Sequence, residues 1–504
     1  MPQTQLSPQS AAKRLATLPP WILLLLVALA ARALTFGNPV VHVDEEFYFT
    51  TARAMVDGAL PYVDVWDRKP IGLFLVYLPA AAFGFPLGIW AYQMMALACV
   101  VGTAVLVARL ATRAGWGKGA MPAAIAYILW LNFIDGQGGQ APVFYNLLMT
   151  GAAAMLAPRA DDRSRPGRRF ALGLGALALV GVSLQIKYSV VFEGAFFGLW
   201  WMWREFRLGT RPVPLLLGAI ALAASAAIPT LAAWGYYQAI GHGADFVYAN
   251  FQSIAERKPD PMLEQLGNLA KILLITSPLL ALAALAWRQR GASDPERAMQ
   301  NWLFGWAGAA LLGLLVFGSW FEHYALPVIA PLACCMAGFL TSHRHARQAM
   351  LLLLAWGAVG GEATLWIKRQ GRGDAAQFAA LASAVGTGPG CLYVYSGSTM
   401  LYAESGRCRL SRYLFPSHLG RKREQGAIGV DQQAEIERIL AQNPEIVVMR
   451  APYLGERPEI RALVARRMAQ AYRLTAQLPM GSDTLSVYAA LASPISARPS
   501  SSSE

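Results

Sequence analysis

The sequence predicts a polytopic α-helical membrane protein with a small α/β domain at its C-terminal end. Of its 504 residues, 55% are hydrophobic and only 14% are charged, whereas a soluble domain carries about 25% charged residues. Apolar stretches of about 16–20 residues recur through the first three quarters of the chain, and each can span a bilayer core. The last quarter differs in composition and alternates short helical and strand patterns, which is typical of an α/β domain.

Eleven apolar runs are predicted to cross the membrane. The first follows Lys13 and Arg14 but lacks a small-residue cleavage site, so we expect a retained helix and not a signal peptide. A further apolar run, 71–88, contains Pro79 and Pro86 and is predicted to lie at the outer surface without crossing. The predicted spans are 21–36, 90–110, 120–134, 143–157, 170–186, 188–203, 213–234, 270–287, 301–318, 323–340 and 348–367.

The distribution of basic residues gives the orientation. Lys and Arg concentrate in alternate loops, and short loops rich in these residues stay in the cytoplasm. All of the basic loops share one side of the membrane only if 71–88 does not cross. We therefore expect a cytoplasmic N-terminus and read the net charge of +13 as a sign of orientation, without a nucleic-acid partner. The predicted outer segments are 37–70, 135–142, 235–268 and 368–504.

The tail defines the predicted domain organisation. We expect a transmembrane domain over 1–367, an extracytoplasmic α/β domain over 368–493 and a disordered Ser/Pro-rich end over 494–504. Within the α/β domain, Cys391 and Cys408 would pair as a disulfide in an oxidising compartment, although two free thiols are equally compatible with the sequence. The expected helices are 374–385 and 431–442, and the expected strands are 391–395 and 445–449.

The first outer loop carries the strongest chemical signal. Asp44, Glu45 and Glu46 are consecutive carboxylates directly after a membrane helix, and such groups cannot enter lipid cheaply. A solvated acidic loop would explain them equally simply. The aromatic residues that follow favour an interfacial amphipathic helix with acids at its start. Two cations, Arg68 and Lys69, come just before the non-crossing run.

The pattern of this loop resembles a known superfamily. Asp44 and Glu45 are followed by Tyr48, and Lys69 and Pro70 then open an apolar run that ends in Phe-Gly. This is similar to the GT-C membrane glycosyltransferases, in particular to the bacterial branch of the protein O-mannosyltransferase and aminoarabinose transferase families. Two further matches are the Glu-His-Tyr-Ala-Leu-Pro stretch 322–327 and the tail segment 401–413.

The resemblance implies transfer of a sugar, with inversion, from a polyprenyl-phosphate carrier to a lipid, glycan or protein acceptor. Asp44 would be the general base, and Glu45 would orient the acceptor or Asp44. Lys69 and then Arg68 would stabilise the charge of the departing lipid phosphate. The other candidate substrate-binding residues are Tyr48, Asp135, Arg257, Lys258, His323 and Tyr324.

The second outer loop departs from the family pattern. Relatives carry an acid in or just after this loop, and here either Asp135 supplies the function from a shifted position or Asn146 replaces it. The acceptor and the participation of a divalent metal therefore stay open, and no metal ligand is assigned. The resemblance also implies a bacterial inner membrane, with the α/β domain in the periplasm.

Other classes of protein fit parts of the sequence. A transporter or flippase would be expected to show paired halves with charges at the membrane midplane. The chain shows no internal repeat, and its acids cluster in an outer loop instead. A non-catalytic assembly subunit would tolerate substitution around Asp44. A ligase or polymerase of lipid-linked glycans would also need basic groups, and only the family resemblance argues against it.

Overall fold

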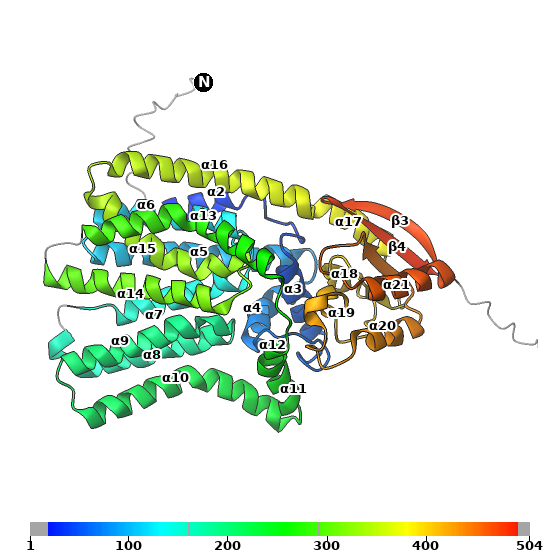
Figure 1. Cartoon of the computed structure of the whole chain (residues 1–504), viewed down its shortest axis with the longest axis horizontal. Coiled ribbons are helices and arrows are strands. Elements are labelled where there is room, and N and C mark those ends of the chain that lie inside the picture. Colours follow the sequence, from blue (N-terminus) through cyan, green and yellow to red (C-terminus); the bar gives the residue numbers. More distant parts are fainter. Residues whose placement is uncertain (1–18, 160–161, 290–292, 492–504) are drawn as a thin grey trace, which may run out of the picture.

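Long helices run side by side through most of the molecule, with the C-terminal elements at one end (Figure 1). This computed structural model describes residues 19–159, 162–289 and 293–491. Each of the eleven predicted spans corresponds to a helix. These helices are α2 (Pro20–Ala31), α5 (Leu87–Arg113), α6 (Gly117–Trp130), α7 (Ala141–Leu156), α8 (Pro166–Leu184), α9 (Val191–Arg207), α10 (Pro212–Ala239), α13 (Met262–Arg288), α14 (Asp294–Phe317), α15 (Leu326–Ser342) and α16 (Ala346–Arg372).

The apolar helices confirm a multi-pass membrane protein. Within the described ranges, seven helical segments are individually long and apolar enough to cross a membrane. Helices α2, α6, α7 and α9 are shorter, between 12 and 17 residues. They pack against the long helices in the same bundle. Apolar runs form helices here because lipid leaves every backbone polar group to be satisfied within the segment.

The run 71–88 forms no single helix. Helix α4 (Ile71–Ala81) has 11 residues, or about 16 Å at 1.5 Å per residue, which is well short of a bilayer core of about 30 Å. A turn containing Pro86 separates it from α5. The run is therefore a short helix and a turn, and its position outside the membrane stays a prediction, because the predicted span α2 is of similar length.

Short helices occupy the predicted outer loops at the end of the bundle where the C-terminal elements lie. Helix α3 (Val43–Val56) packs on α4 in the first loop. The third loop holds α11 (Gly243–Val247), a π-helix (Tyr248–Gln252) and α12 (Ser253–Ala255). Short 3-10 helices lie at Leu131–Ile134, Asp162–Ser164, Tyr188–Val190 and Glu322–Ala325.

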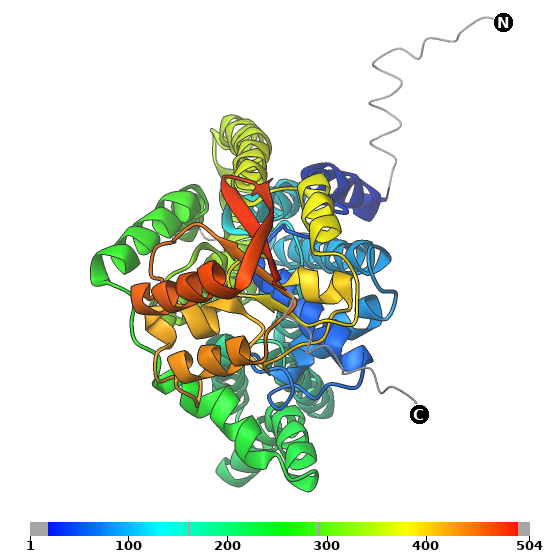
Figure 2. The ribbon, with the colours of Figure 1, turned by 90° about the vertical axis from the view of Figure 1, so that its right-hand side faces the viewer.

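The C-terminal part contains a four-stranded sheet in the order β1-β2-β4-β3. Strands β1 and β2 are parallel, with Val394 opposite Val448, and the other pairs are antiparallel. Figure 2 shows this part in front of the helix bundle. Its elements are α17 (Ala375–Val385), β1 (Leu392–Val394), α18 (Met400–Ser405), α19 (Pro416–Gly420), a 3-10 helix (Lys422–Glu424), α20 (Gln432–Ala441), β2 (Ile446–Arg450), α21 (Pro458–Ala471), β3 (Tyr472–Met480) and β4 (Asp483–Ala490).

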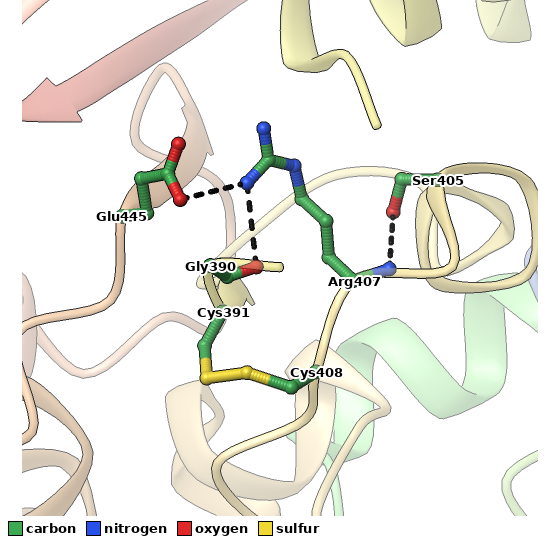
Figure 3. The surroundings of a disulfide bond; sticks show 6 residues. All are labelled: Gly390, Cys391, Ser405, Arg407, Cys408 and Glu445. Atoms are coloured by element: carbon green, nitrogen blue, oxygen red, sulfur yellow. Dashed lines mark hydrogen bonds and ion pairs between the residues drawn. A yellow bond between two sulfur atoms is a disulfide. The ribbon is translucent and has the colours of Figure 1, made fainter. Parts of the chain in front are cut away.

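A disulfide joins Cys391 to Cys408 and ties the start of β1 to the segment after α18 (Figure 3). Beside it, the Arg407 guanidinium lies 3.2 Å from the Glu445 carboxylate and donates a hydrogen bond to the Gly390 carbonyl (3.3 Å). Of the two states that the sequence allowed for this cysteine pair, the structure has the bonded one.

One hydrophobic core runs from the bundle into the C-terminal part. It includes Phe49 and Tyr77 of the first loop together with Phe378, Leu401 and Val487. A second core lies within the C-terminal part but takes in Trp66 from the first loop. The predicted boundary at 367 falls inside α16, which continues to Arg372. The division into domains stays a prediction, and the predicted disordered end 494–504 lies outside the described residues.

Candidate functional site

Helix α3 places three acids beside α4 and α18. His42 caps the helix, because its Nδ1 accepts a hydrogen bond from the Asp44 amide (3.1 Å). Acidic side chains in a first helical turn are favoured by the partial positive charge at that end. Most of α3, including Glu45 and Glu46, is buried. The predictions of an interfacial amphipathic helix and of a solvated acidic loop were therefore wrong, because α4 and α18 cover this helix.

Asp44 lies near the Lys69 cation, two imidazoles and one amide donor. Its Oδ2 lies 3.3 Å from the Gln140 amide nitrogen, 3.7 Å from His323 Nε2 and 3.8 Å from His42 Nδ1. Burial alone would raise the pKa of Asp44. The positive charge of Lys69, the two imidazoles and the Gln140 hydrogen bond outweigh burial and hold the pKa well below its usual range. Asp44 is therefore a carboxylate at neutral pH.

Lys69 is the cation next to this carboxylate. Its Nζ lies 3.7 Å from Asp67 Oδ2 and 5.6 Å from the centre of the Tyr48 ring. Burial would lower the pKa of Lys69, but the charges of Asp67 and Asp44 raise it overall. The structure thus brings together Asp44, Tyr48 and Lys69 as the sequence predicted.

Glu45 faces away from these charges. Its carboxylate lies against Gly138 of the second predicted outer loop, where a Cβ would stand 2.2 Å from Oε2. The side chain is fully buried, and neither oxygen accepts a hydrogen bond of normal geometry. Burial raises the pKa of Glu45 to about 8, against the opposing effects of the Gly139 amide and Arg32. Arg32 itself holds this glycine-rich loop by donating to the carbonyl oxygens of Gly136, Gln137 and Gly138.

Asp135 joins the site from the second predicted outer loop. Its Oδ1 lies 2.8 Å from Lys368 Nζ and 2.9 Å from the Arg372 guanidinium, both at the end of α16. Its Oδ2 lies 3.9 Å from His42 Nε2. Burial opposes these cations, which nevertheless hold the pKa of Asp135 far below its usual value. Asn146 is the residue that would take the place of this acid in the alternative interpretation. Its side-chain amide instead donates a hydrogen bond to the Leu326 carbonyl (3.1 Å).

Three of the predicted cationic residues are held by the C-terminal part. The buried Glu424 carboxylate lies 2.5 Å from the Arg68 guanidinium and 3.1 Å from Arg257 Nε. Lys258 is exposed and donates to the Gln425 side chain (2.9 Å). Arg68 and Arg257 therefore dock the C-terminal part onto the first and third predicted outer loops.

A further lysine lies beside the predicted His-Tyr pair. His323 faces Asp44, and the Tyr324 ring has Lys187 Nζ 4.3 Å from its centre. Lys187 makes no ion pair with a carboxylate in the described ranges, and burial together with the Lys69 charge lowers its pKa to about 7. An anion entering the site would therefore favour its charged form.

Several residues of the site were not expected from the sequence. His42 lies two residues before Asp44, at a position suited to a helix cap. Lys368 and Arg372 are four residues apart, so they share one face of α16. These two signals were present in the sequence. No signal in the sequence pointed to Glu424 and His418, because their contacts with the first loop depend on tertiary packing between distant parts of the chain.

Three side chains could hold a metal ion. One ligand atom from each of His42, Asp135 and His323 lies within 4.8 Å of the other two. Two imidazoles and one carboxylate suit Zn²⁺ or another transition-metal ion better than Mg²⁺. Lys368 and Arg372 already balance the charge of Asp135, so the carboxylate does not depend on a cation from solution.

Comparison with known proteins shows the fold. No protein-family model and no curated protein matches the sequence. Among solved structures, ArnT from Cupriavidus metallidurans in the apo state superposes with a TM-score of 0.62 at 15% identity, covering 95% of this chain and 98% of that one. The same protein bound to undecaprenyl phosphate gives 0.61 at 14% identity, covering 92% and 97%.

A more distant match is the apo oligosaccharyltransferase of Archaeoglobus fulgidus, with a TM-score of 0.51 at 12% identity, covering 85% of this chain and 69% of that one. At these identities the likeness concerns the fold, and it extends over both the helix bundle and the C-terminal part of the ArnT structure. The chain has the fold of the GT-C superfamily of membrane glycosyltransferases. The resemblance found in the first outer loop is thereby confirmed for the fold.

Proposed function

We propose that the protein is an inverting glycosyltransferase that moves a sugar from a polyprenyl-phosphate carrier to a lipid, glycan or protein acceptor. The observation that carries this proposal is a partly buried Asp44 carboxylate that lies 3.7 Å from His323 and 3.3 Å from the Gln140 amide, with the Lys69 charge as the main cause of its lowered pKa. One of the similar ArnT structures is bound to undecaprenyl phosphate, which supports a donor of this class. The fold that the chain shares with the ArnT structures supports the same proposal.

Asp44 would accept the proton of the acceptor hydroxyl. The hydroxyl oxygen then forms a bond to the anomeric carbon, while the bond from that carbon to the phosphate oxygen breaks and its electrons leave with polyprenyl phosphate. Lys69 and Lys187 face the site and would stabilise the leaving phosphate. A bound phosphate would also offset the charge of Lys69, which lowers the pKa of Asp44 in the free protein, and would so strengthen Asp44 as a base.

We also propose that this end of the molecule faces the periplasm of a bacterial inner membrane and that the N-terminus is cytoplasmic. Two observations support this orientation. The basic loops lie at the opposite ends of the spans. The Cys391–Cys408 disulfide belongs to the C-terminal part, and such bonds persist in oxidising compartments.

The test is turnover by the purified protein in lipid nanodiscs with a panel of polyprenyl-phosphate sugars, followed as release of polyprenyl phosphate. Asp44→Asn should lower the rate about a hundredfold or more, the scale of a lost general base. Asp57→Asn, at the other end of α3 and half exposed, is the matched control and should retain the wild-type rate. An unchanged rate in Asp44→Asn would refute the role of Asp44. Sugar-lipid movement across proteoliposomes without turnover would favour a flippase.

A further inference from the structure

A polar cavity lies between α3 and the C-terminal sheet. It has a volume of about 200 Å³. One wall is formed by residues 396–399 and by Arg450, which lie at the carboxyl ends of the parallel strands β1 and β2. Ligands of sheets with parallel strands commonly bind at this edge. The facing wall includes Val43, Glu46 and Arg372.

The charges in this cavity leave one cation without a partner. Arg450 lies 3.0 Å from the Asp483 carboxylate, and Arg372 lies 2.9 Å from Asp135. The Glu46 carboxylate accepts a hydrogen bond from Ser398. The Arg421 guanidinium, by contrast, makes no hydrogen bond or ion pair anywhere in the described residues, and its Nε is buried.

Aromatic and hydroxyl groups complete the cavity. Two guanidinium groups lie near the Tyr453 ring, with their central carbon atoms 4.2 Å (Arg450) and 5.6 Å (Arg421) from the ring centre. The charge of Arg450 disfavours a second uncompensated cation at Arg421, and a bound anion would relieve this repulsion. Ser417 also lines the cavity. Thr399 is 2% exposed, and its hydroxyl oxygen is buried without a hydrogen-bond partner.

We infer that this cavity binds a sugar that carries a phosphate or a carboxylate. An unpaired guanidinium suits either anion, because its planar set of donors matches two oxygen atoms at once. The serine and threonine hydroxyls can donate to and accept from sugar hydroxyls. The Tyr453 ring offers an apolar face to a sugar ring.

The position of the cavity identifies the role of this sugar. Val43 and Glu46 line the cavity and lie within one turn of Asp44 on α3. Arg372 lines the cavity and also contacts Asp135 of the candidate site. The anionic sugar bound here is therefore the acceptor, an assignment that rests on the proposed glycosyltransferase function. The binding of the sugar itself does not depend on that function.

Binding can be measured on the full-length protein in detergent by isothermal titration calorimetry, without any donor. Glucose 1-phosphate and glucuronate are the phosphate and carboxylate probes, and glucose is the neutral one. At least one anionic sugar should bind, and Arg421→Gln should weaken that binding about tenfold or more, with Arg421→Lys recovering part of it. Arg473→Gln, an exposed position at the start of β3, the strand end opposite to the cavity-lining Met480, should bind as wild type does. Melting temperatures verify folding.

Three results would overturn the inference: no binding of either anionic sugar, equal binding of glucose, or unchanged affinity in Arg421→Gln. The acceptor role has its own readout. With a donor that turns over, the bound sugar should accelerate release of polyprenyl phosphate, and Arg421→Gln should raise its KM and leave kcat nearly unchanged. A release rate that does not respond to the bound sugar overturns the acceptor role alone. Absence of turnover with every donor refutes the proposed function but leaves the binding result intact.

Discussion

Asp44 and Glu45 are adjacent acids whose surroundings drive their pKa values apart. Successive residues of a helix point about 100° apart, so Asp44 faces Lys69 and two imidazoles while Glu45 faces the glycines of the second predicted outer loop. Burial opposes ionisation of both, but only at Asp44 do neighbouring charges outweigh it. Such divergence between neighbouring titratable groups is a mark of sites that use one as a base and the other as a neutral donor.

The raised pKa of Glu45 makes stability depend on pH. Burial favours the protonated form of Glu45. Its contribution to stability is therefore fully present below the pKa of an unfolded glutamate and is lost as the pH rises toward about 8. Glu45→Gln cannot ionise and should escape this loss. We expect the melting temperature of the variant, relative to wild type, to rise steadily between pH 5 and pH 8. A difference that stays constant over this range would contradict a buried, titrating Glu45.

The residues of the site differ in how far the sequence could predict them. Asp44, Tyr48 and Lys69 followed from a local motif, and the structure brings them together. The partners of Asp135 could not be predicted in the same way, because Lys368 is 233 residues away in the chain. Arg68 and Arg257 were expected to face a phosphate, and in the structure they face Glu424.

At the scale of elements, apolar length and basic loops predicted the helices well, because lipid permits few alternatives. The C-terminal sheet was predicted only in part. Strands β1 and β2 were expected as apolar runs, but the hairpin of β3 and β4 was not. Most residues of β3 are exposed or partly exposed, so the strand lacks a clear apolar alternation. Gly481, with a positive φ of 61°, marks the turn that joins the two strands.

The disulfide is the covalent constraint on this sheet. It closes a loop with a sequence separation of 17 residues, for which chain entropy predicts about 3 kcal/mol of stabilisation. Replacing Cys391 and Cys408 by serine should lower the denaturant midpoint of the C-terminal part, read from its susceptibility to limited proteolysis, because all 15 tryptophans of the chain precede it. Dithiothreitol should lower the midpoint of the wild type and leave that of the double variant unchanged. Equal sensitivity of the two proteins to dithiothreitol would assign the effect to another site.

At the scale of the whole molecule, the C-terminal part holds the segment that carries Lys69. The Trp66 amide donates to the Arg412 carbonyl (2.8 Å), and the Trp66 ring packs on His418 at 4.7 Å. Asp67 lies 3.8 Å from His418 Nε2, and Arg68 pairs with Glu424. The position of the lysine therefore depends on two regions at once.

Glu424 tests this dependence. Glu424→Gln leaves the guanidinium groups of Arg68 and Arg257 without their counter-ion, and breaking a buried ion pair costs about 3–5 kcal/mol. We expect a melting temperature several degrees lower and a higher KM for the lipid donor. Glu459→Gln removes an exposed partner of Arg457 in the same part of the chain, and exposed pairs contribute little. If Glu424→Gln and Glu459→Gln both keep the melting temperature of the wild type, the contacts of Glu424 do not dock the C-terminal part.

The contact between Arg68 and Glu424 also sets an order of events during synthesis. The two residues are 356 positions apart, and a ribosome adding about 5–20 residues per second needs roughly 20–70 s to make the stretch between them. Throughout that interval the first loop has already emerged, but the surface that holds its cations does not yet exist. An unfinished chain therefore lacks the Glu424 contact that holds Arg68, and this contact forms only after the C-terminal part has been made.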